Sequence, residues 1–158
     1  MDVFITYSRK NENFVLEELL PLLDIYGINF TIDFIDFEPG VPWMDNLMEC
    51  IFNSTKILIV MSSHYLASMN CKKELQQALY NKGTSSIILL RIDSVSVKEF
   101  PKALRNRTFI DYADSVLERH TWKSRVIKAL ERNNEIYSRS VSLESKEDNT
   151  KEGHKNII

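Results

Sequence analysis

Few residues in this sequence have the types and spacing that metal binding or covalent catalysis requires. The two cysteines, Cys50 and Cys71, show no paired spacing, and the three histidines, His64, His120 and His154, are scattered along the chain. Zinc sites and disulfide frameworks use clustered or paired ligands. We therefore expect no metal site, a packed rather than reactive Cys71, histidines at the surface, and a reducing, intracellular environment.

One short segment concentrates charge and turn-forming residues. It reads DFEPG at residues 36–40 and combines two carboxylates, Asp36 and Glu38, with the aromatic Phe37 and the turn formers Pro39 and Gly40. On the residues alone, a Pro-Gly pair can simply turn the chain toward the helix that follows. The alternative is that the segment is exposed because another molecule contacts it. The elements around the segment decide where it lies.

Apolar and β-branched runs predict the strands of a sheet. The run at residues 57–61, ILIVM, is apolar at every position. A central parallel strand needs this composition when helices cover both its faces. The strands are expected at residues 3–7, 28–32, 57–61, 87–90 and 108–112.

Helical periodicity separates these strands. Helices are expected at residues 15–26, 42–51, 70–82 and 116–132, with a weak helical stretch at residues 97–104. Pro21 predicts a kink or a loosened turn in the first helix, because an internal proline removes a hydrogen bond. Gly27 and Gly83 predict helix ends, and Asn70 predicts a helix N-cap.

The alternation of strands and helices predicts the architecture. Strands and helices that alternate at roughly thirty residues or less form an open parallel sheet with right-handed crossovers. The expected fold is α/β and flavodoxin-like, a five-stranded parallel sheet with helices on both faces. Met44, Met48 and Trp122 fall at helical spacing and are expected in the core. Residues 1–133 are expected to form the domain, and the polar residues 134–158 a disordered tail.

Composition excludes several classes of protein. At 158 residues and 44% apolar content, the chain is long enough for one globular domain. Its 20 basic and 22 acidic residues give a net charge of -2, so we expect no nucleic-acid partner. The longest aliphatic run, residues 57–61, is far shorter than the ~20 residues that span a bilayer. The chain is expected to be soluble as written, although Met1, directly before the first strand, fits excision from a longer membrane protein.

The expected sheet also argues against two chemistries. Functional loops of such sheets leave the carboxyl ends of the strands. A nucleotide site needs a glycine-rich phosphate turn after the first strand, but residues 7–13, YSRKNEN, contain no glycine. A phosphate-accepting receiver domain needs an Asp at the end of the third strand, whereas residues 60–63 read VMSS. Neither function is expected.

Several segments together resemble a known family, the Toll/interleukin-1 receptor (TIR) domain. The TIR boxes are matched, in order and spacing, by DVFITYS at residues 2–8, IDFEPG at 35–40, DNLMECIFNSTKILIVMS at 45–62, CKKEL at 71–75, and Trp122. The resemblance runs from residue 2 to about 132, and it implies the flavodoxin-like fold. Many receptor TIR domains have an Arg where this chain has Ile35.

The resemblance implies a role for residues 36–40. In TIR domains the loop after the second strand, called the BB loop, is a surface through which one TIR domain contacts another. Asp36, Phe37, Glu38, Pro39 and Gly40 are therefore the expected partner-binding residues of this chain. A proline limits the backbone entropy that docking removes, which suits this role.

The function that the resemblance implies is intracellular signalling in innate immunity. The chain resembles the TIR domain of a Toll-like or interleukin-1-type receptor, which works by homotypic assembly with itself and with an adaptor. This function needs no cofactor. It places the chain on the cytoplasmic side of a membrane, as the tail of a single-pass receptor, or alternatively in the cytoplasm.

An enzymatic alternative also follows from the resemblance. Some TIR domains cleave the nicotinamide bond of NAD+ with a glutamate in the helix after the third strand, and Glu74 matches that position. NAD+ would then be the substrate, Glu74 the catalytic residue, and Ser8 and Arg9 its contacts. Against this reading, the aromatic residue often found four positions earlier is Asn70 here. Glu74 also has a simpler expected role, since a carboxylate in the first turn of a helix interacts favourably with the helix dipole.

Overall fold

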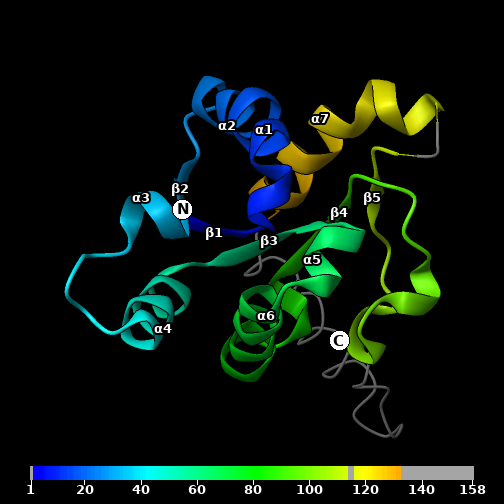
Figure 1. The fold of residues 1–158 in the computed structure, drawn as a ribbon. Helices are drawn as coiled ribbons and strands as arrows, with labels where there is room; N and C mark the ends of the chain where they lie inside the picture. Colours follow the sequence, from blue (N-terminus) through cyan, green and yellow to red (C-terminus); the bar gives the residue numbers. More distant parts are fainter. Residues whose placement is uncertain (1, 114–115, 133–158) are drawn as a thin grey trace, which may run out of the picture.

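The sheet of this protein has five parallel strands, as the sequence predicts. A computed structural model describes residues 2–113 and 116–132. The strands are β1 (Asp2–Thr6), β2 (Asn29–Thr31), β3 (Lys56–Met61), β4 (Ile87–Arg91) and β5 (Ile110–Asp111). They lie in the order β2-β1-β3-β4-β5, which is a flavodoxin-like order (Figure 1).

Helices and short helical turns connect the strands in the predicted alternation. The helices are α1 (Glu12–Phe14), α2 (Leu20–Ile25), α3 (Asp33–Asp36), α4 (Trp43–Asn53), α5 (Ser63–Ala67), α6 (Met69–Lys82) and α7 (Val116–Glu131). Short 3-10 turns occupy Arg9–Asn11, Thr84–Ser86, Val97–Glu99 and Lys102–Leu104. The weak helical stretch predicted before β5 is therefore two separate 3-10 turns.

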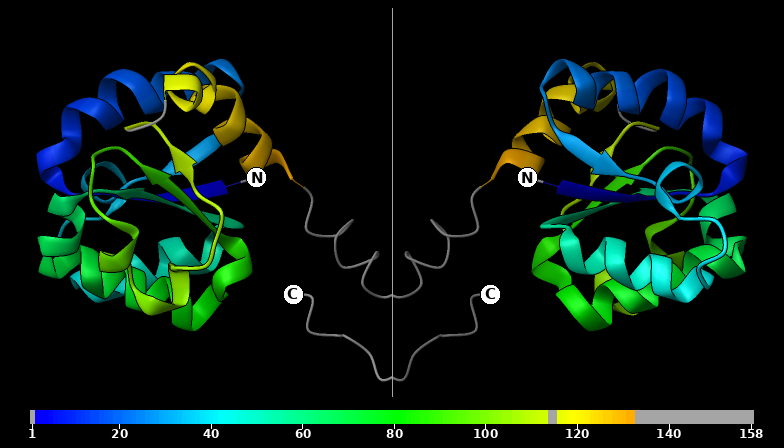
Figure 2. Two further views of the ribbon diagram at one scale, coloured as in Figure 1. Left: turned by 90° about the vertical axis from the view of Figure 1, so that its right-hand side faces the viewer. Right: turned by 90° about the vertical axis from the view of Figure 1, so that its left-hand side faces the viewer.

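The helices cover both faces of the sheet. The first helical segment, which runs from α1 to α2, and α7 lie on one face, and α4, α5 and α6 lie on the other (Figure 2). Side chains of β3 alternate between the two resulting cores: Leu58 and Val60 face the first, and Ile57 and Ile59 face the second. This double coverage explains why residues 57–61 of β3 are all apolar.

The first helical segment is continuous but loosened before Pro21. A π-helical turn (Val15–Leu19) joins α1 to α2, and the Leu20 N–H bonds the Val15 carbonyl. This turn is the local loosening that an internal proline predicts. After α2, Gly27 has φ +65°, and its N–H and that of Ile28 bond the carbonyls of Asp24 and Leu23. This pattern is a Schellman cap, so the predicted glycine stop is confirmed.

The start of α6 differs from the prediction. The N-cap is Ser68, whose Oγ accepts a hydrogen bond from the Cys71 N–H at 3.2 Å, and Asn70 lies inside the helix. The prediction of Asn70 as the N-cap was wrong. Ser68 takes this role because it lies three residues before Cys71, which is the spacing at which an N-cap side chain accepts a backbone N–H of the first turn. Gly83, with φ +73°, ends α6 as expected.

Core predictions hold for Trp122 and fail for Met44. Trp122, on α7, is 3% exposed, and Phe14 and Tyr112 pack against its ring. Met44 is 38% exposed, in the first turn of α4, where the BB loop joins the helix. Met48 is half-buried.

Some expectations concern parts of the chain that the structure does not describe. The predicted tail at residues 134–158, with His154, lies outside residues 2–113 and 116–132. Within these described ranges, no helix combines the length and apolar character needed to cross a bilayer.

Candidate functional site

The BB loop projects from the edge of the sheet, between α3 and α4. Figure 1 shows the chain leaving α3, running outward, and returning into α4. Glu38, Pro39 and Gly40 are exposed, and Gly40 has the positive φ of +87° that favours glycine. Phe37 is half-buried, with its ring edge against Trp43 at 6.3 Å between centroids. The loop is therefore accessible and anchored at its base.

Asn46 fixes the shape of this loop from the first turns of α4. Its Oδ1 accepts from the Glu38 N–H at 3.0 Å, and its Nδ2 donates to the carbonyls of Glu38 at 3.1 Å and Val41 at 3.4 Å. Asn46 itself is only 6% exposed. The backbone of the loop is thus tied to the helix while its outer side chains remain free for contact.

Asp36 does not project as the other loop residues do. It ends α3, and its Oδ2 accepts a hydrogen bond from the Ile32 N–H at 2.7 Å. The carboxylate therefore stabilises the helical turn that precedes the projecting part of the loop. Ile35, on the same turn, is 59% exposed and adds an apolar side chain beside the loop.

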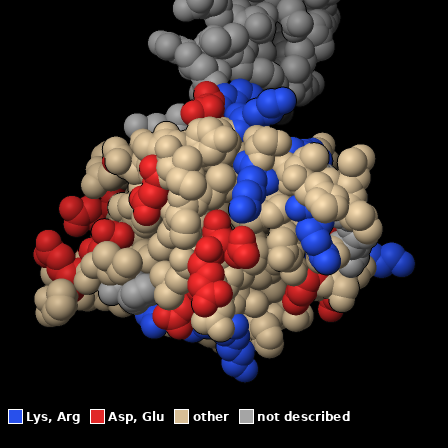
Figure 3. All heavy atoms as spheres, turned by 90° about the horizontal axis from the view of Figure 1, so that it is seen from above, with Lys and Arg blue, Asp and Glu red and all other residues tan. Residues whose placement is uncertain are grey.

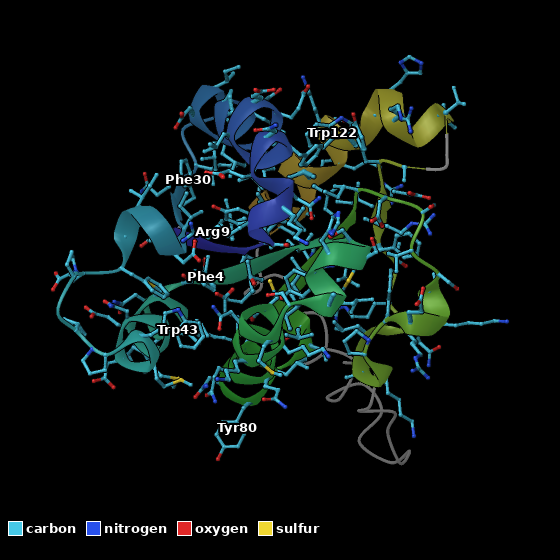
Figure 4. All side chains as sticks on the ribbon, in the orientation of Figure 1. Phe4, Arg9, Phe30, Trp43, Tyr80 and Trp122 are labelled. Atoms are coloured by element: carbon cyan, nitrogen blue, oxygen red, sulfur yellow. The ribbon has the colours of Figure 1, made fainter. Side chains whose placement is uncertain are left out.

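A shallow hollow of about 380 Å³ lies beside the BB loop. Arg9, Asp33 and Trp43 line it together with loop residues, and Arg9 Nη2 lies 3.7 Å from Asp33 Oδ2. Figure 4 shows Arg9 beside β1 and Trp43 on α4. Ser8 is buried, and its Oγ accepts from the Lys10 N–H at 3.3 Å. Of the two predicted NAD+ contacts, Arg9 reaches the hollow and Ser8 caps a turn behind it.

Glu74 lies outside this hollow, in the layer between α6 and β1. It is 4% exposed, and Thr6 Oγ1 donates a hydrogen bond to its Oε2. The Tyr65 hydroxyl lies 3.0 Å from the same Thr6 oxygen. Glu74 is not in the first turn of α6, so the expected helix-dipole role was wrong. Burial raises the pKa of Glu74 to about 7.

Charges at the hollow act on the Glu74 carboxyl. Burial is the largest cause of the raised pKa of Glu74. The hydrogen bond from Thr6 lowers this pKa, the negative charge of Asp33 raises it, and the positive charge of Arg9 lowers it. The carboxyl is therefore electrostatically coupled to the hollow while its surface is covered. A substrate in the hollow would reach it only after Thr6 or its neighbours moved.

Sequence reasoning missed the residues that shape this region. Trp43 and Asn46 lie shortly after the BB loop in the sequence. Two features could have indicated them: a Trp directly after Pro42, and a polar residue beside the buried Leu47. Thr6 gave no signal, because a β-branched residue is ordinary in a strand.

The remaining candidates for chemistry behave as packed or surface residues. Cys71 is 3% exposed, and burial raises the pKa of its thiol to about 12, so it stays protonated. His64 and His120 are exposed. Among residues 2–113 and 116–132, no three His, Cys, Asp or Glu side chains are grouped to hold a metal ion.

Removing the Asn46 side chain is expected to loosen the BB loop. Asn46→Ala deletes three hydrogen bonds to the backbone of the BB loop, which costs about 1 to 2 kcal/mol of unfolding free energy. Urea unfolding measures this loss. Asn53→Ala, at an exposed position of the same helix, is the matched control and should change stability by less than about 0.5 kcal/mol. Equal losses in the two variants would show that Asn46 does not hold the loop.

Comparisons with known proteins identify relatives of this chain. A family model described as "TIR domain" matches residues 3–131. Toll-like receptor 13 of Mus musculus is 32% identical over 142 residues, which cover 82% of this chain and 14% of that receptor. Toll-like receptor 4 of Homo sapiens is 30% identical, covering 82% of this chain and 17% of the receptor. The chain thus spans less than one fifth of the length of these relatives.

Solved structures agree with the sequence relatives. The TIR domain of the Toll-related receptor TRR-2 from Hydra magnipapillata superposes with a TM-score of 0.69 at 25% identity, covering 80% of this chain and 96% of that one. A metazoan TIR-STING receptor from C. gigas, at 21% identity and a TM-score of 0.66, covers 82% of this chain and 40% of its own and supports the fold alone. By sequence and by structure, this chain belongs to the TIR domain family and is homologous to the signalling domains of Toll-like receptors.

Proposed function

We propose that this chain transmits a signal by homotypic docking of TIR domains through the BB loop, recruiting another TIR domain of its own kind or of an adaptor. The observation that carries the proposal is the loop itself: exposed at Glu38, Pro39 and Gly40, yet held from behind by Asn46. A surface whose backbone is already ordered loses little entropy when a partner binds it. Substitution at Pro39 tests the proposal.

The chemistry of the loop suits a weak, regulated contact. Phe37 offers an aromatic surface at the base of the loop, Glu38 offers a charge at its rim, and Ile35 offers an apolar side chain beside it. We expect the interface formed by this loop to bury less than about 1,200 Å² of surface, which is typical of transient signalling contacts. Clustering of parent receptors would raise the local concentration of such domains enough to drive assembly.

The relatives of the chain support a proposal for its place in a cell. The Toll-like receptors are several times longer than this chain, and the matched part covers 14% to 17% of them. We place the chain on the cytoplasmic side of a membrane, attached to a receptor that supplies the remaining length. Another part of the receptor would then sense the stimulus, and this domain would respond to the resulting change in the local concentration of TIR domains.

NAD+ cleavage is the second candidate function. It is favoured by a buried carboxyl, Glu74, with a pKa of about 7, electrostatically coupled to a hollow that holds Arg9 and Trp43. A carboxylate beside the glycosidic bond would stabilise the oxocarbenium-like centre that forms as nicotinamide leaves. Trp43 offers an aromatic ring at the hollow, where the expected ring at position 70 is replaced by Asn70. The cover over Glu74 makes this function second to docking.

Incubation with NAD+ separates the two functions. We expect the purified chain at high concentration to leave NAD+ intact, since Glu74 is covered and hydrogen-bonded by Thr6. Chromatography of free nicotinamide measures the outcome, with Glu74→Ala as the matched variant. Nicotinamide that accumulates with the unmodified chain and not with Glu74→Ala would establish the enzymatic function instead.

A further inference from the structure

A second hollow lies on the opposite side of the sheet from the BB loop, at the amino ends of the strands. It has a volume of about 550 Å³ and is bounded by the first residues of β4, by residues 107–110 at the start of β5, and by the last turns of α7. Small-molecule sites typically occupy about 300 to 1,000 Å³. The hollow is therefore large enough for a small molecule and too small for a folded partner.

Four cationic side chains line this hollow. Arg125 and Lys128 lie on α7, Arg132 directly follows the last residue of that helix, and Arg107 comes from the segment before β5. The spacing of three residues places Arg125 and Lys128 on one face of α7, and Arg132 follows four residues after Lys128. No acidic residue is among the described residues that line the hollow. Figure 3 shows Lys and Arg side chains at the top, right and lower edge of the face that includes α7, interspersed with Asp and Glu side chains that are most numerous at its left and centre.

Arg107 is fixed in place at the hollow. Its Nη2 donates to the Ile87 carbonyl at 2.7 Å, which ties the guanidinium to the first residue of β4. The charges of Arg107 and Arg132 also reach Lys56, the first residue of β3, which is 2% exposed. Burial, followed by Arg132 and Arg107, lowers the pKa of Lys56. Positive charges from β3, from the segment before β5 and from the end of α7 therefore lie near one another at this end of the sheet.

The helix dipole alone does not account for this arrangement. Cations in the last turn of a helix stabilise its carboxyl end, which suits Lys128 and Arg132. Arg107 belongs to no helix, and Arg125 lies nearly two turns before the end of α7, yet both line the same hollow. A bound anionic ligand would explain why cations from two segments converge on one cavity.

We propose that this hollow binds a small anion carrying two or more phosphate groups. Guanidinium groups present paired N–H donors that match phosphate oxygens, and three of the four cations are arginines. A phosphate group carries about -1.5 to -2 charges near neutral pH, so a ligand with two such groups presents negative charge to the cations of both segments. The ligand is a soluble polyphosphorylated molecule or the headgroup of a phosphorylated lipid, since both present the same chemistry.

Titration calorimetry with inositol 1,4,5-trisphosphate tests this site at about 0.15 M salt, where diffuse attraction is screened. We expect saturable binding of one ligand per chain. The double variant Lys128→Gln with Arg132→Gln should weaken binding about tenfold or more, because two charge-assisted hydrogen bonds are lost. Lys72→Gln with Lys98→Gln removes two exposed cations far from the hollow and should change the affinity by less than about twofold.

Two further measurements locate the ligand and its source. Ligand-induced shifts of the backbone amide signals of Arg107 and Thr108 would place the anion in the hollow independently of any variant. Vesicles containing phosphatidylinositol 4,5-bisphosphate identify a lipid source if they bind the chain and compete with the free anion, and a soluble source if they do not. Absence of saturable binding, or equal weakening in the two double variants, would overturn the proposal.

Discussion

Replacement of Pro39 by His is expected to abolish association between copies of this domain while leaving its melting temperature nearly unchanged. Pro39 is exposed at the outer part of the BB loop, so the substitution removes no packing. It does remove the fixed φ of proline and changes the surface that a partner would contact. Copies labelled with donor and acceptor dyes and tethered to vesicles at high density would measure the association by energy transfer.

The chain offers a matched control for this substitution. Pro21 is also exposed, but it lies on the first helical segment, away from the BB loop. Pro21→His should keep the energy transfer of the unmodified chain, because it leaves the loop intact. A Pro39→His variant that melts several degrees lower would instead make Pro39 a structural residue. Transfer that survives Pro39→His at full strength would remove the loop from the docking surface.

A large dependence of stability on pH is expected from Glu74. The folded chain holds this carboxyl at a pKa of about 7, above its ordinary value of 4.5. Between these values the folded state keeps a proton that the unfolded state has released, so stability falls as pH rises through about 7. From about pH 5 to about pH 8 this group should cost on the order of 2 to 3 kcal/mol.

Glu74→Gln isolates this contribution. Glutamine keeps the shape of the side chain and an oxygen that can accept from Thr6, but it does not ionise. Urea unfolding should show the variant gaining stability over the unmodified chain as pH rises toward about 8. Glu17→Gln, at an exposed position, should leave the pH profile unchanged. A difference between Glu74→Gln and the unmodified chain that is the same at every pH would mean that Glu74 ionises normally.

The fold was predictable where packing leaves a period in the sequence. The apolar character of residues 57–61 in β3 follows from the position of this strand in the middle of the sheet, and Pro21 correctly marked the loosened turn before it. The short helix α5 was missed, because five residues are too few to show a helical period and only Tyr65 is buried. The start of α6 was misplaced, since Ser68 and Asn70 are both good N-cap residues.

The candidate site was predictable only in part, for physical reasons. The charged and turn-forming residues 36–40 drew attention to this segment, the resemblance to TIR domains implied its role as the BB loop, and the structure leaves Pro39 exposed. The inward hydrogen bond of Asp36 and the support from Asn46 depend on how α3 and α4 approach each other, which no local pattern encodes. The burial of Glu74 beneath Thr6 likewise depends on contact between α6 and β1, which are far apart in the sequence.

The most direct test of docking through the BB loop is a titration followed by NMR. An isotope-labelled chain would be titrated with an unlabelled copy, and the backbone amide signals that shift would map the contact. We predict that the shifts are largest at Phe37, Glu38, Gly40 and Val41, at and next to the BB loop. Shifts confined to another surface, such as the outer face of α6 around the exposed Tyr80, with the loop unaffected, would contradict it.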